Sequence, residues 1–190
     1  MDYFNQQSDQ ELIESYFKGE EKSLEILIKR YLKPIYNFVY QYVSNSQDTE
    51  DITQDVFIKI WRNFRKFDRN RNFKTWIFSI AKNTCFDWLK KKKPIVFSMF
   101  DTEEGKNILS ETLIDPSPLP DELAERADIS EMLGKAIKKL PPPYRLVLIL
   151  RQRYSFTFCE IAEILKEPID TVKTRYRRGT EVLKKIFQNK

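Results

Sequence analysis

The stretch TFCEIAEILKEPIDTVKTRYRRG, residues 157–179, decides the fold of the C-terminal part of the chain. Thr157 and Glu160 have the spacing of a capping box, which predicts a short helix that begins there. A turn containing Pro168 follows, and a long helix is expected from Asp170. Two helices separated by about four residues are typical of a helix-turn-helix, whose second helix enters the major groove of DNA.

The long helix is predicted to have two different faces. Its buried stripe should lie at positions that step by four and three, namely Val172, Tyr176, Gly179, Leu183 and Ile186. The opposite face then carries Lys173, Thr174, Arg177 and Arg178. Arginine can bond guanine with two hydrogen bonds and threonine can contact a thymine methyl, so this face suits a major groove. A solvated basic face on an ordinary helical hairpin is the alternative.

The rest of the chain is also predicted to be helical. Only four glycines among 190 residues, together with long apolar periodicities, argue for an all-α protein with few tight turns. We expect two small helical domains, residues 8–93 and 121–190, joined by a flexible linker, residues 94–120. No apolar stretch approaches the roughly 20 residues that span a bilayer, and no N-terminal run resembles a signal peptide, so a cytoplasmic protein is expected.

Charge is distributed in blocks. The net charge is +5, yet residues 62–93 hold eleven Lys and Arg against two acids, and residues 135–190 hold fourteen against five. Between them, residues 101–125 hold eight acids against one lysine. Two basic blocks joined by an acidic one suggest two separate contacts with a polyanion.

Four helices are predicted in the N-terminal part. Ser8 and Glu11 have capping-box spacing for the first, which Gly19 is expected to end. The second covers residues 20–44, and Pro34 is expected to kink or divide it. The third is expected to be capped by Asp48 and to run to about Phe64, and the fourth to be capped by Asn72.

The fourth helix is predicted to bury one stripe, which consists of Phe73, Trp76, Ile77, Ile80, Ala81, Thr84 and Trp88. It would leave outside Lys74, Lys82, Asn83 and Lys90. All three tryptophans, Trp61 included, are assigned to packing, with stacking on a base of a melted DNA strand as the alternative. In the C-terminal part, the prolines 141–143 are expected to interrupt a helical region that begins near Asp121, and another helix is expected over residues 144–153.

These motifs resemble a known family. The segments DTEDITQDVFIKIW (48–61) and FDRNRNFKTWIFSIAKNTCFDWLKKKK (67–93) resemble region 2 of bacterial sigma factors of the small extracytoplasmic-function (ECF) group. LPPPYRLVLILR (140–151) and FCEIAEILKEPIDTVKTRYRRGTEVL (158–183) are similar to region 4 of the same group. The resemblance implies an RNA polymerase subunit that recognises promoters. Departures from the family's usual residues include Ser155, where glycine is frequent, and Lys166 with Glu167 in the turn.

The resemblance implies a contact with core RNA polymerase. In this family the helix that matches residues 48–61 docks on the clamp coiled coil of the largest subunit. The residues here that would offer acids with an apolar neighbour are Asp51, Gln54, Asp55 and Ile58. For Asp48 and Glu50, simple complementation of the helix dipole is an equal alternative.

The resemblance also implies recognition of the −10 element. The loop KFDRNRN (66–72) matches the family's specificity loop, which captures a flipped base. Arg69 and Arg71 are expected phosphate contacts, and Asn70, Asn72 and Asn83 are expected readers of base edges. Phe67 and Phe73 are expected as core anchors of the loop. The lysine run Lys90, Lys91, Lys92 and Lys93 would touch upstream phosphates, with a solvated helix end as the alternative.

Region 4 is then expected to read the −35 element. The readers would be Lys173, Thr174, Arg177 and Arg178, with Arg175 as a phosphate contact. In this family the linker threads the polymerase's active-site and RNA-exit path, so its acids would imitate nascent RNA; a plain tether is the alternative. The resemblance further implies an anti-sigma factor as a partner.

Enzymatic function finds little support in the sequence. The chain has no histidine, no phosphate-binding glycine loop and no cysteine cluster, so we expect no catalysis, cofactor or metal. Cys85 and Cys159 are expected as buried, inert thiols in a reducing compartment, with a redox-sensing role for either as the alternative. A free-standing repressor is the remaining rival, and it would bind duplex promoter DNA without polymerase.

Overall fold

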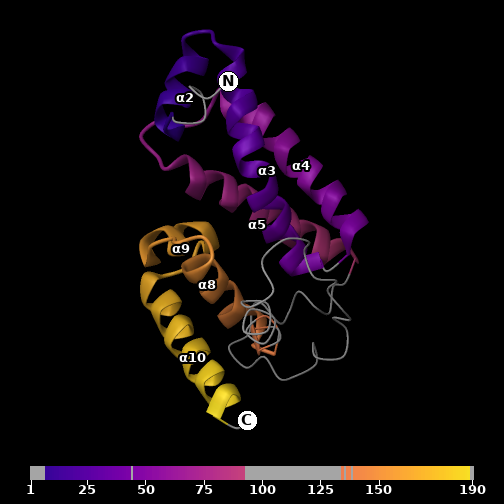
Figure 1. Cartoon of the computed structure of the whole chain (residues 1–190), viewed down its shortest axis with the longest axis vertical. Helices are drawn as coiled ribbons and strands as arrows, with labels where there is room; N and C mark the ends of the chain where they lie inside the picture. The colour runs from indigo at the N-terminus through magenta and orange to yellow at the C-terminus, as the bar shows by residue number, and fades with distance from the viewer. Residues whose placement is uncertain (1–6, 44, 93–133, 135, 138, 189–190) are drawn as a thin grey trace, which may run out of the picture. The chain divides into compact units, whose positions relative to one another are not determined.

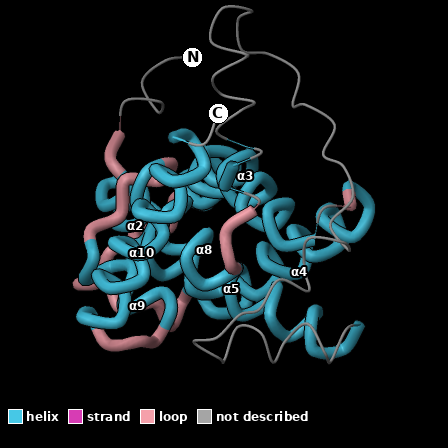
Figure 2. Tube along the Cα trace, turned by 90° about the horizontal axis from the view of Figure 1, so that it is seen from below, coloured by secondary structure: helices cyan, strands magenta, loops and turns pink. Residues whose placement is uncertain are grey.

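The computed structural model describes residues 7–43, 45–92, 134, 136–137 and 139–188. Over these residues the chain forms seven α-helices and no strand (Figures 1 and 2). It divides into two compact units, Met1–Trp88 and Leu89–Lys190. The predicted all-α class is confirmed. The expected linker and residues 121–133 of the expected helical region lie outside the described residues, whereas residues 134, 136 and 137 are helical.

The N-terminal unit is built from α2 (Asp9–Phe17), α3 (Glu21–Val43), α4 (Ser46–Phe64) and α5 (Phe73–Lys92), the last of which extends one turn past the unit boundary at Trp88. Helix α3 packs against both α2 and α4, and α3 and α4 run side by side in Figure 1. Aromatic contacts join α5 to them, since the rings of Phe38 in α3 and Phe78 in α5 meet edge to face with centroids 5.1 Å apart.

Side-chain caps set where these helices begin. The predicted capping box is present, because Glu11 N donates to Ser8 Oγ and Ser8 N donates to Glu11 Oε2. The prediction that Asp48 caps α4 is wrong: Asn45 is the cap, and its Oδ1 accepts from Asp48 N at 3.0 Å. The helix begins one turn earlier than expected, which places Asp48 in its first turn, where its charge still complements the dipole.

Helix α3 runs through Pro34 as one helix, so Pro34 does not divide it; of the two expected outcomes, a kink stays a prediction. Proline removes one backbone donor, and the Arg30 carbonyl thereby loses its partner four residues on. Tyr31, Ile35 and Phe38, on either side of the proline, are buried, and this packing stabilises the helix there. Packing therefore outweighs the local cost of the proline.

Helix α5 is buried on more than its predicted stripe. Phe78, Cys85 and Leu89 are buried in addition to Phe73 and Ile77. Of the four polar residues expected outside, only Lys90 is fully exposed; the half-buried ones are Lys74, Lys82 and Asn83. The helix thus lies deeper in its unit than an amphipathic surface helix would.

The C-terminal unit contains α8 (Pro142–Gln152), α9 (Phe158–Leu165) and α10 (Ile169–Gln188). Residues 139–141 are not helical, so the expected interruption is present, but α8 begins at Pro142 and not at Tyr144, with Pro141 at the cap position. Proline is tolerated there because the first amide groups of a helix have no intrahelical acceptor. The predicted Thr157–Glu160 capping box opens α9.

Helix α10 packs on both α8 and α9. Val172 and Gly179 on its inner stripe are buried, and Tyr176, Leu183 and Ile186 are partly covered. A Cβ atom at Gly179 would lie 2.9 Å from Leu148 Cδ1, so the two helices approach closely at this point. The predicted helix-turn-helix is therefore present, with its stripe turned toward the unit's core.

Two loop residues of this unit have backbone conformations that favour glycine. Ser155 has φ 58° and Lys166 has φ 57°. After Lys166, Glu167 N donates to Ala162 O at 3.1 Å and Lys166 N donates to Glu163 O at 3.3 Å, which is the hydrogen-bond pattern of a Schellman end. The glycine frequent at the family position of Ser155 thus has a backbone reason.

Replacing Lys166 by glycine should stabilise the C-terminal unit by about 1 kcal/mol, because glycine adopts the left-handed conformation without the Cβ clash. Lys166→Ala, which keeps the Cβ, is the control and should give no gain. Urea unfolding followed by circular dichroism measures the change. The unfolding midpoint followed by tryptophan fluorescence should not change, since Trp61, Trp76 and Trp88 all lie in the N-terminal unit. Equal stability of the glycine and alanine variants would contradict the inference that the backbone of Lys166 is strained.

Candidate nucleic-acid interface

The outward face of α10 carries exposed cations. Lys173, Arg177 and Arg178 are exposed, and Thr174 beside them is half-buried. Lys173 Nζ lies 3.8 Å from Asp170 Oδ1, a loose contact between exposed groups one turn apart. Such a pair contributes little to the free energy of folding, so the lysine can readily leave the aspartate for another anion. These four predicted residues share one side of the helix, opposite its buried stripe.

Arg175 differs from its neighbours. Its side chain is 16% exposed, and its Nη1 donates to both carboxylate oxygens of Glu167, at 2.8 and 2.6 Å. Glu167 belongs to the turn between α9 and α10 and is 26% exposed. The residue predicted as a phosphate contact is therefore engaged within the protein itself.

A set of side-chain contacts fixes α8, α9 and α10 to one another. Gln152 Nε2 donates to the Tyr176 hydroxyl at 2.6 Å, and the rings of Tyr176 and Phe158 meet edge to face at 5.3 Å. Arg151 stacks over Phe158 at 4.8 Å, and its Nη1 donates to Phe156 O at 2.8 Å. The basic face thus rests on a rigid frame.

The loop between α4 and α5 is folded by its own polar groups. Asp68 Oδ1 accepts from Asn70 N, and Asn72 Oδ1 accepts from Thr75 N, each at 3.0 Å. Asn72 therefore caps α5 as predicted, and its side-chain Oδ1 is occupied by the hydrogen bond of that cap. Arg69, Asn70, Arg71 and Asn72 are all exposed residues of this loop.

Aromatic side chains anchor the loop from beneath. Phe67 and Phe73 are buried, as expected of core anchors. The Phe67 ring lies 4.8 Å from that of Trp76, and Phe73 meets Phe64 at 5.8 Å and 90°. The loop's polar residues are thereby displayed on a fixed apolar base.

A pocket of about 620 Å³ lies between this loop and α2. It is lined by Gln10, Glu14, Phe17, Lys18, Phe67, Asp68, Arg69 and Asn70. The Arg69 guanidinium sits 5.1 Å from the centre of the Phe17 ring, a cation–π contact that links the loop to α2. The sequence patterns predict the loop residues but not the wall from α2. Phe17, an aromatic residue two positions before Gly19, was the available signal.

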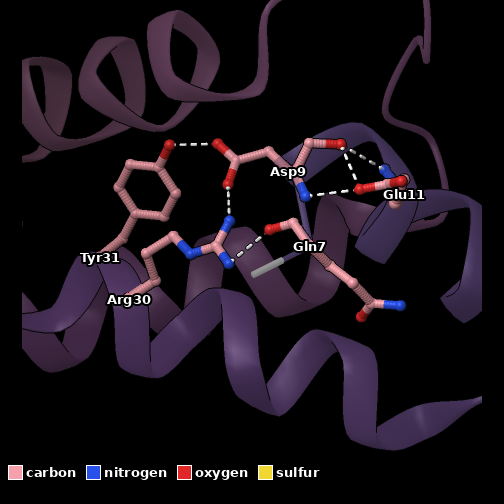
Figure 3. A network of polar contacts seen from close by, with 6 residues as sticks. Gln7, Asp9, Glu11, Arg30 and Tyr31 are labelled. Carbon is pink, nitrogen blue, oxygen red and sulfur yellow. Dashed lines mark hydrogen bonds and ion pairs between the residues drawn. The ribbon is translucent and has the colours of Figure 1, made fainter. Parts of the chain in front are cut away.

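A polar network holds α2 in place beside α3 (Figure 3). Arg30 Nη1 donates to Asp9 Oδ1 at 2.6 Å, and Arg30 Nη2 donates to Gln7 O at 2.7 Å. The hydroxyl of Tyr31 donates to the other oxygen of Asp9. Burial, together with the Asp9 carboxylate, raises the pKa of Tyr31 well above its usual range, so it remains a donor. The network fixes the helix that forms one wall of the pocket.

Helix α4 turns a mixed acidic and apolar face outward. Asp51, Gln54 and Asp55 are exposed, and so is Ile58. Trp61 is 63% exposed, so its assignment to packing is wrong. It lies three residues after Ile58 and seven after Gln54, which places it on the same face; this spacing was the signal that sequence reasoning left unused.

The remaining predicted residues lie in the middle and at the end of α5. Asn83 is half-buried, and Lys90, Lys91 and Lys92 are exposed in the last turn. Cations there complement the negative end of the helix dipole whatever else they bind. Lys93 lies outside the described residues.

The two cysteines differ from each other. Cys85 is buried, and burial raises the pKa of its thiol. Cys159 is exposed, so the expectation that both thiols are buried is wrong for this one.

The part of the chain that the structure describes contains no group of His, Cys, Asp and Glu arranged to hold a metal ion. Among those same residues, no helix is long and apolar enough to span a membrane.

Comparison with known proteins identifies the chain. Residues 27–95 match the family described as Sigma-70 region 2, and residues 127–181 match Sigma-70, region 4. The chain is a sigma factor of the sigma-70 family. It is 36% identical over 176 residues to the ECF RNA polymerase sigma factor SigW of Bacillus subtilis, with 90% of this chain and 92% of that protein covered. The chain therefore belongs to the ECF group, and it directs RNA polymerase to promoters.

Two further relatives agree. The ECF RNA polymerase sigma-E factor of Escherichia coli is 31% identical over 180 residues, covering 94% of this chain and 93% of that protein. A solved structure of the sigma factor RpoE with the anti-sigma factor NepR, from Bartonella quintana, shares the fold at a TM-score of 0.68 and 23% identity. That comparison covers 88% of this chain and 98% of the other. As a sigma factor with both regions, the chain has core RNA polymerase and promoter DNA as its partners.

Proposed function

We propose that three surfaces of the chain divide the work of promoter recognition. The outward face of α10 reads the −35 element, the pocket between α2 and the α4–α5 loop takes a base extruded from the −10 element, and the exposed face of α4 binds the polymerase clamp. The observation that carries the proposal is the separation of α10 into a buried stripe and an exposed cationic face, on the second helix of a helix-turn-helix.

The −35 assignment rests on exposure and chemistry. Lys173, Arg177 and Arg178 stand on the exposed side of the helix, within its first half, where a helix-turn-helix brings side chains to base edges. Arginine recognises guanine through two acceptors of the major groove, and lysine neutralises phosphate. Thr174, half-buried beside them, offers a hydroxyl and a methyl group at the same surface.

The −10 assignment rests on the pocket. An extruded base needs an apolar or aromatic surface to replace the lost stacking, and polar groups at the rim to contact its edges. Phe17 and Phe67 supply aromatic surface, and Gln10 and Asn70 supply amide groups that both donate and accept. Arg69 and Lys18 bring positive charge toward the phosphates that flank such a base.

The polymerase assignment rests on the face of α4. Its acids suit a basic partner helix, and the exposed Ile58 and Trp61 add apolar surface beside them. Tryptophan is among the residues that contribute most to binding at protein interfaces when it becomes buried there. Trp61 thereby extends the surface predicted from Asp51, Gln54, Asp55 and Ile58.

The chain acts in this proposal by binding alone, without bond-making chemistry of its own, and it works in the cytoplasm beside the polymerase. An anti-sigma factor is a further proposed partner. Its support is that the similarly folded RpoE was solved in complex with the anti-sigma factor NepR. Occlusion of the α4 face would then prevent polymerase binding.

Replacing Arg177 and Arg178 together by alanine should reduce −35-dependent promoter affinity at least tenfold, because each arginine that pairs with a base is worth roughly 1–3 kcal/mol. Core-polymerase affinity should not change. Electrophoretic mobility shift of the holoenzyme measures the first quantity, and fluorescence anisotropy with core enzyme the second. The control replaces Lys184 and Lys185 by alanine; these are exposed cations two turns further along α10. Equal losses for both pairs would mean that α10 contributes only non-specific charge.

Replacing Phe17 by leucine should weaken capture of single-stranded −10 DNA by the holoenzyme about fivefold to tenfold, because the ring's stacking surface is lost while its apolar volume is kept. Phe187→Leu is the matched control, since Phe17 is 37% and Phe187 40% exposed. Binding of a fluorescent single-stranded oligonucleotide that carries the −10 element measures the effect. Unchanged binding by the Phe17 variant would remove α2 from the site.

Replacing Trp61 by alanine should lower core-polymerase affinity by about 2 kcal/mol, as expected of a tryptophan at an interface centre. Reversal of Asp51 and Asp55 to lysine should weaken the same complex. Leu32→Ala is the control, because Leu32 is an exposed apolar residue of the same unit, on α3. Titration of core enzyme with labelled protein is the measurement. If the Leu32 and Trp61 variants bound equally well, the face of α4 would be wrongly assigned.

A further inference from the structure

The pair formed by Glu167 and Arg175 stands apart from the other charges of the helix-turn-helix. Its two residues are eight positions apart, one in the turn and one in the second turn of α10, and both side chains are largely covered. The other ion pair described on α10, between Asp170 and Lys173, is looser at 3.8 Å and much more exposed. The Glu167–Arg175 contact is therefore the firm polar link across this turn.

We infer that Arg175 is a positioning residue: it holds the turn and the N-terminal half of α10 in register through Glu167, instead of contacting DNA phosphate. The acid in the turn is then required for −35 binding although its charge opposes DNA. This inference rests on the proposed role of α10 at the −35 element and assigns one further interaction to it.

The turn needs such a link. Lys166 occupies a left-handed conformation that costs a residue other than glycine roughly 1–2 kcal/mol. Pro168, two residues later, has no amide hydrogen to donate. Backbone hydrogen bonds tie the turn back to α9, from Glu167 N to Ala162 O, but the contact forward to the second turn of α10 is made by the Glu167 side chain. Loss of the pair would leave the angle of α10 less firmly set.

A phosphate role for Arg175 has a specific cost. Movement of its guanidinium to DNA would leave the Glu167 carboxylate, only 26% exposed, without this partner and close to the phosphate backbone. A partly buried carboxylate that loses its ion pair is destabilised by desolvation and by repulsion from the DNA. Arg177 is exposed, so its guanidinium can reach a DNA phosphate without uncovering a partly buried carboxylate.

The two roles predict opposite signs for one substitution. If Arg175 bound phosphate, removal of the neighbouring acid would relieve repulsion and tighten DNA binding. If the pair positions α10, removal of either partner weakens binding, and removal of both weakens it no further than one, because the same contact is lost each time. The sign of the Glu167 effect and the additivity of the pair therefore distinguish the roles.

The experiment measures affinity of the holoenzyme, reconstituted from core polymerase and the full chain, for a duplex selected from a random library by the wild-type holoenzyme. A duplex with a scrambled −35 element serves as the reference. The variants are Glu167→Gln, Arg175→Ala, the double variant and Arg175→Lys. Glu181→Gln, at an exposed acid of the same helix, is the control for loss of negative charge.

We expect Glu167→Gln and Arg175→Ala each to weaken binding to the selected duplex about tenfold, with little change on the scrambled one. The double variant should match the single variants. Arg175→Ala should leave the slope of log affinity against log salt unchanged, whereas loss of a phosphate contact would reduce its magnitude by roughly 0.9. Arg175→Lys, which keeps the charge and alters the geometry, should weaken binding and covers the case in which the alanine variant unfolds.

Tighter binding by Glu167→Gln, or a reduced salt slope for Arg175→Ala, would overturn the inference. Arg177→Ala in the same assay tests the proposed function separately. If that variant loses affinity while Glu167→Gln gains it, the −35 role of α10 stands and the positioning role fails. If Arg177→Ala has no effect on either duplex, the proposed role of α10 fails, and the inference fails with it.

Discussion

The close packing of α10 on α8 is the constraint on which the C-terminal unit depends. Gly179 lets the two helices approach so closely that a Cβ atom at this position would lie 2.9 Å from Leu148 Cδ1. Val172, two turns earlier on the same stripe, is also buried. Since a helix has a fixed rotation per residue, burial of this stripe decides which side chains face solvent. The cations of α10 therefore lie together on the exposed face, because the apolar residues lie on the buried face.

The same arrangement recurs in the N-terminal unit, where polar residues stand on an apolar base. Phe67 and Phe73 bury their rings beneath the α4–α5 loop and leave its arginines and asparagines outside. Asp9, held between Arg30 and Tyr31, fixes α2 as the opposite wall of the pocket (Figure 3). Binding groups placed on a rigid frame lose little conformational entropy when they meet a ligand, which suits a protein that must capture single bases.

Local patterns in the sequence were enough to predict most helices, both capping boxes and the two faces of α10, because these follow from spacing of three and four residues. The features missed depend on contacts between distant segments. The wall from α2, the pairing of Arg175 with Glu167 and the depth of α5 come from packing that a local pattern does not contain. Trp61 was misassigned because large aromatic residues are usually buried, although its spacing from Ile58 placed it on the exposed face.

The account holds that one protein contacts two promoter elements with two units, and that core polymerase is needed to place them. Hydroxyl-radical footprinting on a promoter selected by the holoenzyme tests this most directly. With core enzyme present, protection should appear at both the −35 and the −10 elements, and the protein alone should protect neither. A footprint of the same site by the free protein, or protection confined to one element in the holoenzyme, would contradict the account.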